Sequence, residues 1–227
     1  MRTRPIVSLH VSVVGLGCNN FGRRLDLERT RTVVDAALDA GVTFLDTANV
    51  YGGTDSEAFL GRVLEERRDR VVLATKFGHP SDAEARGGHP DAIRPALETS
   101  LRRLRTDHVD LYQLHRPDPA VPVAETLGAL DELVRAGLTR AVGCSHFTTA
   151  QLDEADAAAT AGTRFVSVQN EYSLLHREPE ADVLATCERL GLGFLPYFPL
   201  ANGLLTGKYV DGIPEGGLRL EGFKRDA

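Results

Sequence analysis

The chain has 227 residues, 42% of them hydrophobic, and a formal net charge of −6. This length and apolar content suit one sizeable core, so we expect a single domain. Lys and Arg are scattered among Asp and Glu, as on a solvated surface, so we expect neither nucleic acid nor a membrane as a partner.

The cysteines and histidines do not indicate a disulfide framework or a metal site. Cys18, Cys144 and Cys187 are far apart and lack a CxxC spacing, and the histidines show no HExxH motif. His10 and Ser12 interrupt the N-terminal apolar stretch, and no later stretch approaches membrane-spanning length. We therefore expect a reduced, cytoplasmic protein without a bound metal.

Short apolar runs rich in β-branched residues alternate with longer stretches of helical periodicity along the whole chain. The predicted strands are Val11 to Leu16, Val42 to Leu45, Val71 to Thr75, Val109 to Leu114, Thr139 to Gly143, Phe165 to Val168 and Gly193 to Tyr197. The predicted helices are Leu27 to Ala40, Asp55 to Arg68, Pro90 to Leu104, Val123 to Ala136, Thr149 to Ala159 and Pro179 to Leu190. This alternation predicts an α/β fold with a parallel sheet, and its evenness favours a barrel.

Polar side chains follow nearly every predicted strand. In chain order they are Asp46, Lys76, His115, Ser145 with His146, Gln169 with Asn170, and Tyr197. In a parallel barrel these strand ends share one rim, which is where barrel enzymes build their active sites. Each residue alone could be a helix cap or a solvated loop residue, but six successive polar strand ends indicate a site.

The residues near the second, third and fourth strand ends predict proton transfer to an oxygen. Tyr51 is a poor donor at neutral pH because the ordinary pKa of tyrosine is about 10. We expect Lys76 to lower that pKa and Asp46 to keep Lys76 protonated. His115 would be a second donor, so the set favours reduction of a carbonyl. A Schiff-base aldolase using Lys76 is an alternative, although Asp46 argues against it.

The segments FLDTANVYG, VVLATKFG, VDLYQLHRPD, AVGCSHF, VSVQNEYSLL and PYFPLANGLLTGKY follow one another along most of the chain. In this order and spacing they resemble the signature segments of the aldo-keto reductase superfamily. The resemblance implies that Asp46, Tyr51, Lys76 and His115 form a catalytic tetrad. It further implies that Tyr51 is the general acid for an aldehyde or ketone and that NADPH supplies the hydride, with NADH left open.

The resemblance also implies a set of cofactor contacts. Ser145 and Gln169 match positions that hydrogen-bond the nicotinamide carboxamide, and Tyr197 matches the aromatic residue that stacks on its ring. The pyrophosphate loop corresponds to residues 198–208 and contributes Phe198, Leu200, Gly207 and Lys208. Asp46 counts among the cofactor contacts as well. His146 stands where the family usually has Asn and still offers a donor, whereas Phe198 stands where Ser is common and offers none.

Two glycine-containing segments resemble nucleotide motifs only in part. GLGCNN, residues 15–20, lacks the third glycine of a dinucleotide fingerprint. We interpret it as a turn whose backbone approaches the cofactor, with Gly17, Cys18 and Asn19 as candidate contacts. GLLTGK, residues 203–208, has neither the spacing nor the hydroxyl residue of a phosphate-binding loop.

The end of the chain departs from the complete (β/α)8 barrel that the resemblance implies. DGIPEGGLRLEGFKRDA is polar and aperiodic and offers no eighth strand. We therefore predict an incomplete TIM-type barrel over residues 1–210, an irregular tail over 211–227, and a C-terminally truncated relative or fragment. Open edges on the first and seventh strands would allow self-association. A non-catalytic cofactor-sensing subunit or an inactive fragment is the alternative to a reductase.

Overall fold

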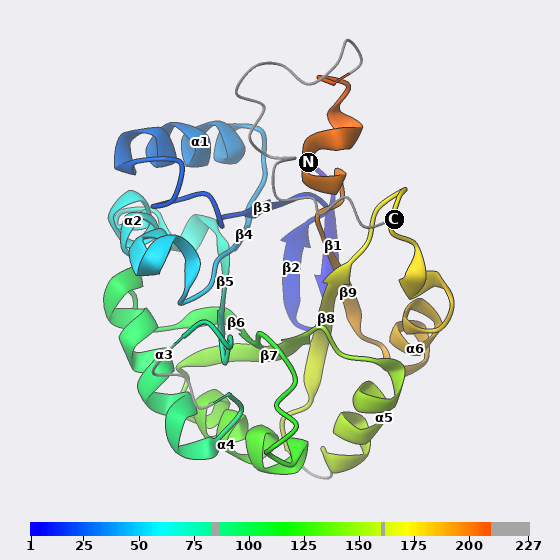
Figure 1. Ribbon diagram of the computed structural model, residues 1–227. Helices are drawn as coiled ribbons and strands as arrows, with labels where there is room; N and C mark the ends of the chain where they lie inside the picture. The colour runs from blue at the N-terminus through cyan, green and yellow to red at the C-terminus, as the bar shows by residue number, and fades with distance from the viewer. Residues whose placement is uncertain (83–86, 160–161, 210–227) are drawn as a thin grey trace.

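Seven short strands run parallel and follow one another in chain order around a curved sheet (Figure 1). The computed structural model describes residues 1–82, 87–159 and 162–209. The strands are β3 (Gly15–Gly17), β4 (Phe44–Asp46), β5 (Val72–Phe77), β6 (Val109–Leu114), β7 (Thr139–Ser145), β8 (Phe165–Glu171) and β9 (Gly193–Tyr197). This arrangement confirms the predicted α/β barrel, with β3 and β9 as the outermost strands of the sheet.

Helices surround the sheet on its outer side (Figure 1). They are α1 (Leu27–Asp39), α2 (Asp55–Leu64), α3 (Pro90–Leu104), α4 (Val123–Arg135), α5 (Thr149–Ala158) and α6 (Val183–Leu190). Short 3₁₀ helices are η1 (Tyr51–Thr54), η2 (Arg68–Arg70), η3 (Glu178–Glu180) and η4 (Ala201–Thr206). The largest hydrophobic cluster lies between the sheet and these helices and contains Leu45, Leu73, Tyr112 and Val142. The predicted tail, 211–227, lies outside the described residues.

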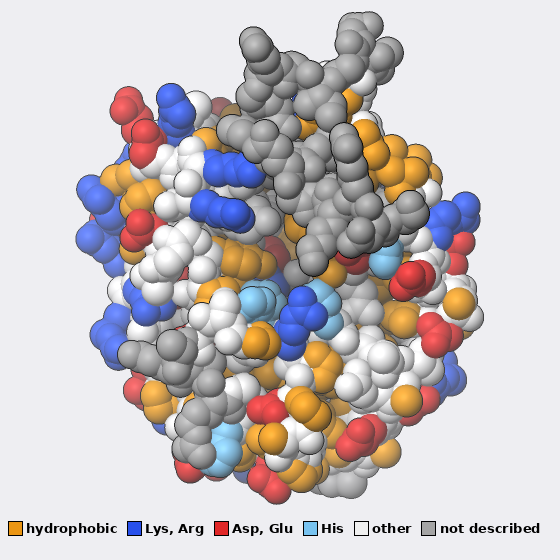
Figure 2. Space-filling view, in the orientation of Figure 1, with side chains coloured by type: hydrophobic (Ala, Val, Ile, Leu, Met, Phe, Trp, Pro, Cys, Tyr) orange, Lys and Arg blue, Asp and Glu red, His pale blue; other side chains and the backbone are white. Residues whose placement is uncertain are grey.

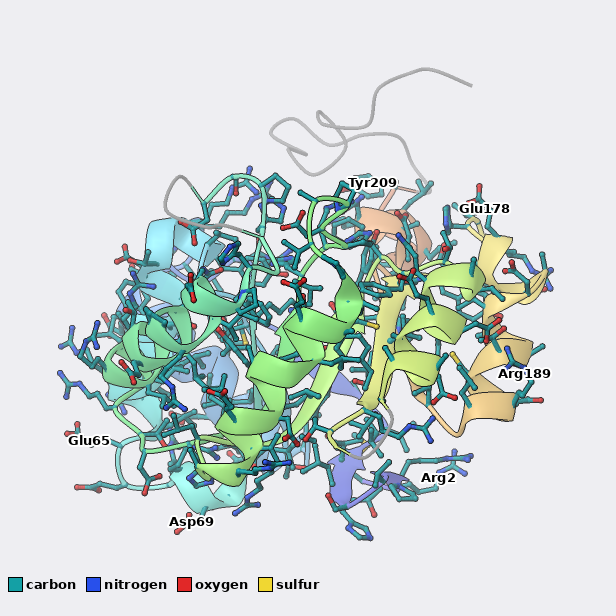
Figure 3. All side chains as sticks on the ribbon, turned by 90° about the horizontal axis from the view of Figure 1, so that it is seen from below. Arg2, Glu65, Asp69, Glu178, Arg189 and Tyr209 are labelled. Carbon is teal, nitrogen blue, oxygen red and sulfur yellow. The ribbon has the colours of Figure 1, made fainter. Side chains whose placement is uncertain are left out.

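An N-terminal hairpin, which the sequence did not predict, packs against the inside of the barrel. It consists of β1 (Thr3–Ile6) and β2 (Leu9–Ser12), and its residues Ile6, Leu9 and Val11 belong to an inner hydrophobic cluster. Figure 3 shows Arg2 and Tyr209 at opposite ends of the molecule. The hairpin therefore closes the end opposite the one that Tyr209 marks.

The predicted strand from Val11 to Leu16 is wrong, because two separate strands share this segment. The Ser12 hydroxyl donates to the Val14 carbonyl at 2.7 Å and accepts from the backbone N–H groups of Thr43 and Phe44 at 3.0 and 3.1 Å. These bonds bend the chain between β2 and β3 and leave Val14 exposed.

Two predicted helices are each four residues shorter in the structure, whereas the other helix bounds differ by at most one residue. α2 ends at Leu64, and the following segment bends so that the Arg68 guanidinium donates to the buried Asp110 carboxylate at 2.8 Å. α6 begins at Val183, after Pro179 has been taken up in η3. In the described ranges no helix is both long and apolar enough to cross a membrane.

The alternation of side chains along the strands sorts apolar from polar residues inside the barrel. In each of three strands, two residues point into the barrel. The first of the two packs on the hairpin, and the second stands two positions further toward the carboxyl end of the strand. In β4, β5 and β6 these pairs are Phe44 and Asp46, Ala74 and Lys76, and Leu111 and Gln113. The pleat therefore brings the predicted polar strand ends together at one rim.

Candidate active site

Three of the predicted catalytic side chains form a connected cluster at this rim. Lys76 Nζ lies 2.6 Å from Asp46 Oδ2, donates to the Thr47 carbonyl at 2.9 Å, and lies 3.5 Å from the Tyr51 hydroxyl. The Lys76 side chain is fully buried, whereas 15% of the Asp46 side chain is exposed. The ammonium therefore has its hydrogens directed at an acid, a carbonyl and the phenol.

Tyr51 is positioned by the tight turn of η1 rather than by a strand. Its backbone N–H donates to the Ala48 carbonyl at 3.1 Å, and Gly52 follows it with a φ of 61°. A Cβ on Gly52 would collide with the Phe21 carbonyl oxygen. Glycine is therefore required both for the left-handed backbone and for the close approach of the Phe21 segment.

The pKa of Tyr51 is raised, contrary to the expectation that Lys76 would lower it below its ordinary value. Burial is the largest cause; the ammonium of Lys76 acts in the opposite direction without overcoming it. The pKa of Lys76 is also raised. Burial alone would lower the pKa of Lys76, but the charge and hydrogen bond of Asp46, together with Tyr51, outweigh burial. At neutral pH the cluster thus holds a protonated phenol beside an ammonium.

His115 completes the predicted tetrad and is a neutral imidazole. Burial, followed by the charge of Lys76, lowers the pKa of His115 to about 2. Its ring lies edge-on to Tyr51, with ring centroids 5.8 Å apart. Its Nδ1 atom is buried without a hydrogen-bond partner among the described residues, so a proton on the other ring nitrogen is favoured.

Two neighbours of the tetrad were missed by the sequence analysis. Gln113 is fully buried and donates from Nε2 to Asp46 Oδ1 at 3.0 Å, which leaves Oδ2 for Lys76. Its position two residues before His115, within the strand that His115 follows, was the available signal. His79 lies in the loop after β5, where no pattern marks it, and its ring centroid is 4.6 Å from that of His115.

The predicted carboxamide contacts, Ser145 and Gln169, lie next to each other at the ends of β7 and β8. The Ser145 hydroxyl donates to the Gln169 carbonyl at 2.7 Å and keeps its lone pairs as acceptors. The Gln169 side-chain amide has no hydrogen-bond partner among the described residues, and the buried Oδ1 of Asn170 is likewise unpaired there. The unpaired Gln169 amide and the acceptor lone pairs of the Ser145 hydroxyl suit a planar aromatic amide such as nicotinamide.

Tyr197 and His146 face each other beside Ser145 and Gln169. Their ring centroids are 5.2 Å apart, and the Tyr197 hydroxyl lies 3.5 Å from His146 Nδ1. Burial, followed by the charge of Glu171, raises the pKa of Tyr197 to about 12. Burial lowers the pKa of His146 to about 4. Both side chains are therefore uncharged at neutral pH and offer a ring surface and hydrogen-bonding groups.

The predicted pyrophosphate loop is a glycine-containing turn with one cation. Phe198 has a φ of 51° and a half-exposed ring that lies edge-on to Tyr197, and the Leu200 side chain is exposed. Gly207 has a φ of 80°. Lys208 folds back so that a Cβ on Gly203 would lie 3.3 Å from Nζ. A turn that carries an ammonium is suited to a phosphate group.

The three candidates at the end of β3 differ from one another. Gly17 faces open space, and Asn19 is half-buried. The Cys18 thiol is fully buried in the core; its backbone N–H donates to the Asp46 carbonyl, and its carbonyl accepts from Ser56. Cys18 thus links β3 to β4 and α2, and we leave its side chain out of the proposed cofactor site.

A cavity of about 460 Å³ lies beside the site rather than in it. It is bounded by η1, α3 and the loop after β5, with Val50, Gly78 and Arg103 in its wall. Among the described residues that line it, none belongs to the predicted tetrad. The candidate tetrad lies instead at the mouth of the barrel, and Figure 2 shows histidine and cationic side chains gathered near the centre of the face.

The fold and the side chains define a parallel α/β-barrel protein with a carboxylate, lysine, tyrosine and histidine site at its carboxyl-end rim. The chain matches the model of the aldo/keto reductase family over residues 13–221. It therefore belongs to this family, which confirms the resemblance read from its motifs.

Individual relatives agree with this assignment. The uncharacterized oxidoreductase YrpG of Bacillus subtilis (strain 168) is 41% identical over 216 residues, which are 88% of this chain and 66% of the relative. Probable aldo-keto reductase 1 of Glycine max is 35% identical over 214 residues, 90% of this chain and 60% of the relative. The chain thus spans about 60 to 66% of the length of these curated relatives.

Two solved structures share the fold. A thermostable aldo-keto reductase in complex with the inhibitor epalrestat superposes with a TM-score of 0.82 at 31% identity, covering 95% of this chain and 79% of that one. The holo form of an aldo-keto reductase from Bacillus halodurans superposes with a TM-score of 0.81 at 34% identity, covering 90% and 68%.

Proposed function

We propose that this protein reduces the carbonyl group of an aldehyde or ketone, with NADPH as the expected hydride donor and NADH as the alternative. The observation that carries the proposal is the line of contacts from Asp46 through Lys76 to the Tyr51 hydroxyl, at 2.6 and 3.5 Å. A phenol beside a buried ammonium is suited to donate a proton to an oxygen that gains negative charge.

Tyr51 is the general acid in this proposal. Because burial raises its pKa, the phenol carries its proton at neutral pH. As the carbonyl carbon accepts a hydride, the carbonyl oxygen takes the phenolic proton, and the phenolate that remains lies beside the Lys76 ammonium. Asp46 keeps Lys76 charged throughout. Lys76 therefore lowers the free energy of the phenolate, a species that burial alone would disfavour.

His115 acts as a neutral hydrogen-bond donor to the same oxygen. Its lowered pKa prevents it from carrying a second positive charge beside Lys76. With Nδ1 buried and unpaired, the proton on Nε2 is available to orient the carbonyl. The aldolase alternative requires an uncharged amine on Lys76, which its raised pKa opposes.

A nicotinamide cofactor supplies the hydride when it is bound. The free amide of Gln169 and the Ser145 hydroxyl fit its carboxamide, and the ring of Tyr197 offers a stacking surface. Lys208 and the backbone of the preceding turn fit the pyrophosphate. Gly17 and Asn19 at the end of β3 provide further backbone and amide groups at the same rim.

Turnover of an aromatic aldehyde with NADPH tests this function, and it is monitored by the absorbance of the reduced cofactor. We expect Tyr51→Phe to reduce the rate on the order of a hundredfold while cofactor affinity is retained, because a general acid acts mainly in the transition state. Tyr112→Phe is the matched control, since this buried phenol contacts the Ile93 carbonyl on the helical side of the sheet. A parent rate no higher than that of Tyr51→Phe would refute the proposal.

A further inference from the structure

Arg116 is a cation at the mouth of the proposed site that the tetrad does not use. It directly follows His115 at the end of β6 and is exposed. Its charge acts on four rings of the rim, those of His79, His115, His146 and Tyr197. Arg116 therefore lies within electrostatic range of both the proton-donating side and the proposed nicotinamide side of the rim.

The acids of this rim are already engaged by other groups. Asp46 is bound by Lys76 and Gln113, and Asp82 accepts a hydrogen bond from the Asn49 side chain at 2.7 Å. Glu171 acts on Tyr197 through its charge and a hydrogen bond.

Within the part of the chain that the structure describes, Arg116 itself has neither an ion-pair partner nor a side-chain hydrogen bond. By contrast, Arg68 and Arg140 both pair with Asp110, which lies at the other end of β6. Arg116 thus presents an uncompensated positive charge to the mouth of the barrel.

The surrounding imidazoles do not change this balance. His115 and His146 have pKa values lowered to about 2 and about 4, first by burial, so both are neutral at pH 7. His115 connects the proposed general acid to Arg116, because its ring contacts Tyr51 and Arg116 follows it in the chain. A molecule bound with its carbonyl oxygen at Tyr51 and His115 would lie near this exposed, unpaired guanidinium, because its charge acts on His115 and on three other rings of the rim. The planar donors of a guanidinium match a carboxylate.

We propose that Arg116 binds a carboxylate carried by the substrate and makes this protein selective for aldehydes or ketones that bear one. This inference rests on the proposed carbonyl reduction and specifies its substrate class. The carbonyl end lies against Tyr51, and the carboxylate end pairs with the guanidinium at the rim. Arg116 is a specificity-determining residue in this arrangement and takes no part in proton transfer.

The kinetic test compares para-carboxybenzaldehyde with its methyl ester, two aldehydes that differ mainly in charge. We expect the parent to prefer the acid and Arg116→Gln to raise the KM of the acid about tenfold, the size of one charge-assisted hydrogen-bond pair. The ester should respond much less. Arg62→Gln is the matched control, because Arg62 is exposed on α2 and has no ion-pair partner among the described residues.

A binding arm separates this inference from the proposed function. The ring-carbon NMR signals of His79, His115 and His146 are followed while para-carboxybenzaldehyde is titrated into the chain saturated with oxidised cofactor, which prevents reduction. We expect the acid to shift these signals, with an affinity lost in Arg116→Gln and kept in Arg62→Gln. If binding of the acid depends on Arg116 in this way but no turnover is found, the proposed reductase function is rejected and the carboxylate site is retained.

Three results would overturn the assignment of Arg116. The first is an equal change for acid and ester in Arg116→Gln. The second is the same loss in Arg62→Gln, which would indicate a general effect of net charge. The third is a loss of NADPH affinity as large as the loss for the acid, which would assign the guanidinium to the cofactor.

Discussion

At the scale of single residues, the site depends on which groups keep their protons. Tyr51 keeps its proton because burial outweighs the neighbouring ammonium, and Lys76 keeps its charge because Asp46 outweighs burial. The sequence predicted the second relation and the identity of both partners. It did not predict the first, because the degree of burial of a tyrosine in a turn depends on segments far away in the chain.

Gln113 illustrates a residue that the strand pattern allowed but that was not selected. It is fully buried inside the barrel and holds Asp46 Oδ1 at 3.0 Å, so it fixes the carboxylate that orients Lys76. A rule based on strand ends identifies His115 and overlooks the residue two positions earlier, although both project to the same face.

Replacing Gln113 should therefore impair turnover through Asp46. We expect Gln113→Leu to reduce kcat about tenfold with little change in cofactor affinity, because one hydrogen bond to a charged group is lost. Ser167→Ala is the control, since the Ser167 hydroxyl is buried in the same interior and is unpaired among the described residues. Steady-state kinetics of both variants measure this, and equal effects would show that Gln113 has no special role.

At the scale of elements, the strands and helices of the barrel units were largely predictable, whereas the N-terminal hairpin was not. The apolar runs and the helical periodicity between them are local signals. The division between β2 and β3 depends on Ser12, which hydrogen-bonds to the backbone of β4 more than thirty positions away. Nothing within the segment from Val11 to Leu16 reveals such a bond.

The turn of η1 offers a test of how an element positions the general acid. We expect Gly52→Ala to destabilise the protein by more than about 1 kcal/mol and to reduce turnover, because a left-handed backbone and a collision with the Phe21 carbonyl add up. Gly53→Ala is the matched control, since Gly53 also has a positive φ, of 66°, but faces open space. Urea unfolding and aldehyde turnover of both variants measure the difference, and equal losses would contradict this account.

At the scale of the whole molecule, the barrel brings residues from six strand ends to one mouth and leaves β3 and β9 as the outer strands of the sheet. Membership in the family and the fold follow from the comparisons, while self-association through these two strands stays a prediction. Because the chain spans only 60 to 66% of its curated relatives, their activities are proposals here.

The buried neutral His115 should make the stability of the whole protein depend on pH. Its pKa is about 2 when folded, below the ordinary 6.5, so the unfolded chain binds the proton first and stability falls as the pH drops below 6.5. For this one group the loss between pH 7 and pH 5 is about 2 kcal/mol. Urea unfolding at both pH values should show a weaker pH dependence in His115→Gln. An unchanged dependence would contradict the burial of a neutral imidazole.

The most direct test of the central claim follows the hydride itself. The protein is incubated with an aldehyde and NADPH carrying deuterium at the transferable position, and the alcohol is analysed by mass spectrometry. We predict one deuterium on the former carbonyl carbon, formed by the parent and by Tyr112→Phe but on the order of a hundredfold more slowly by Tyr51→Phe. Alcohol without deuterium, or labelled alcohol formed equally fast by Tyr51→Phe, would contradict carbonyl reduction with Tyr51 as the general acid.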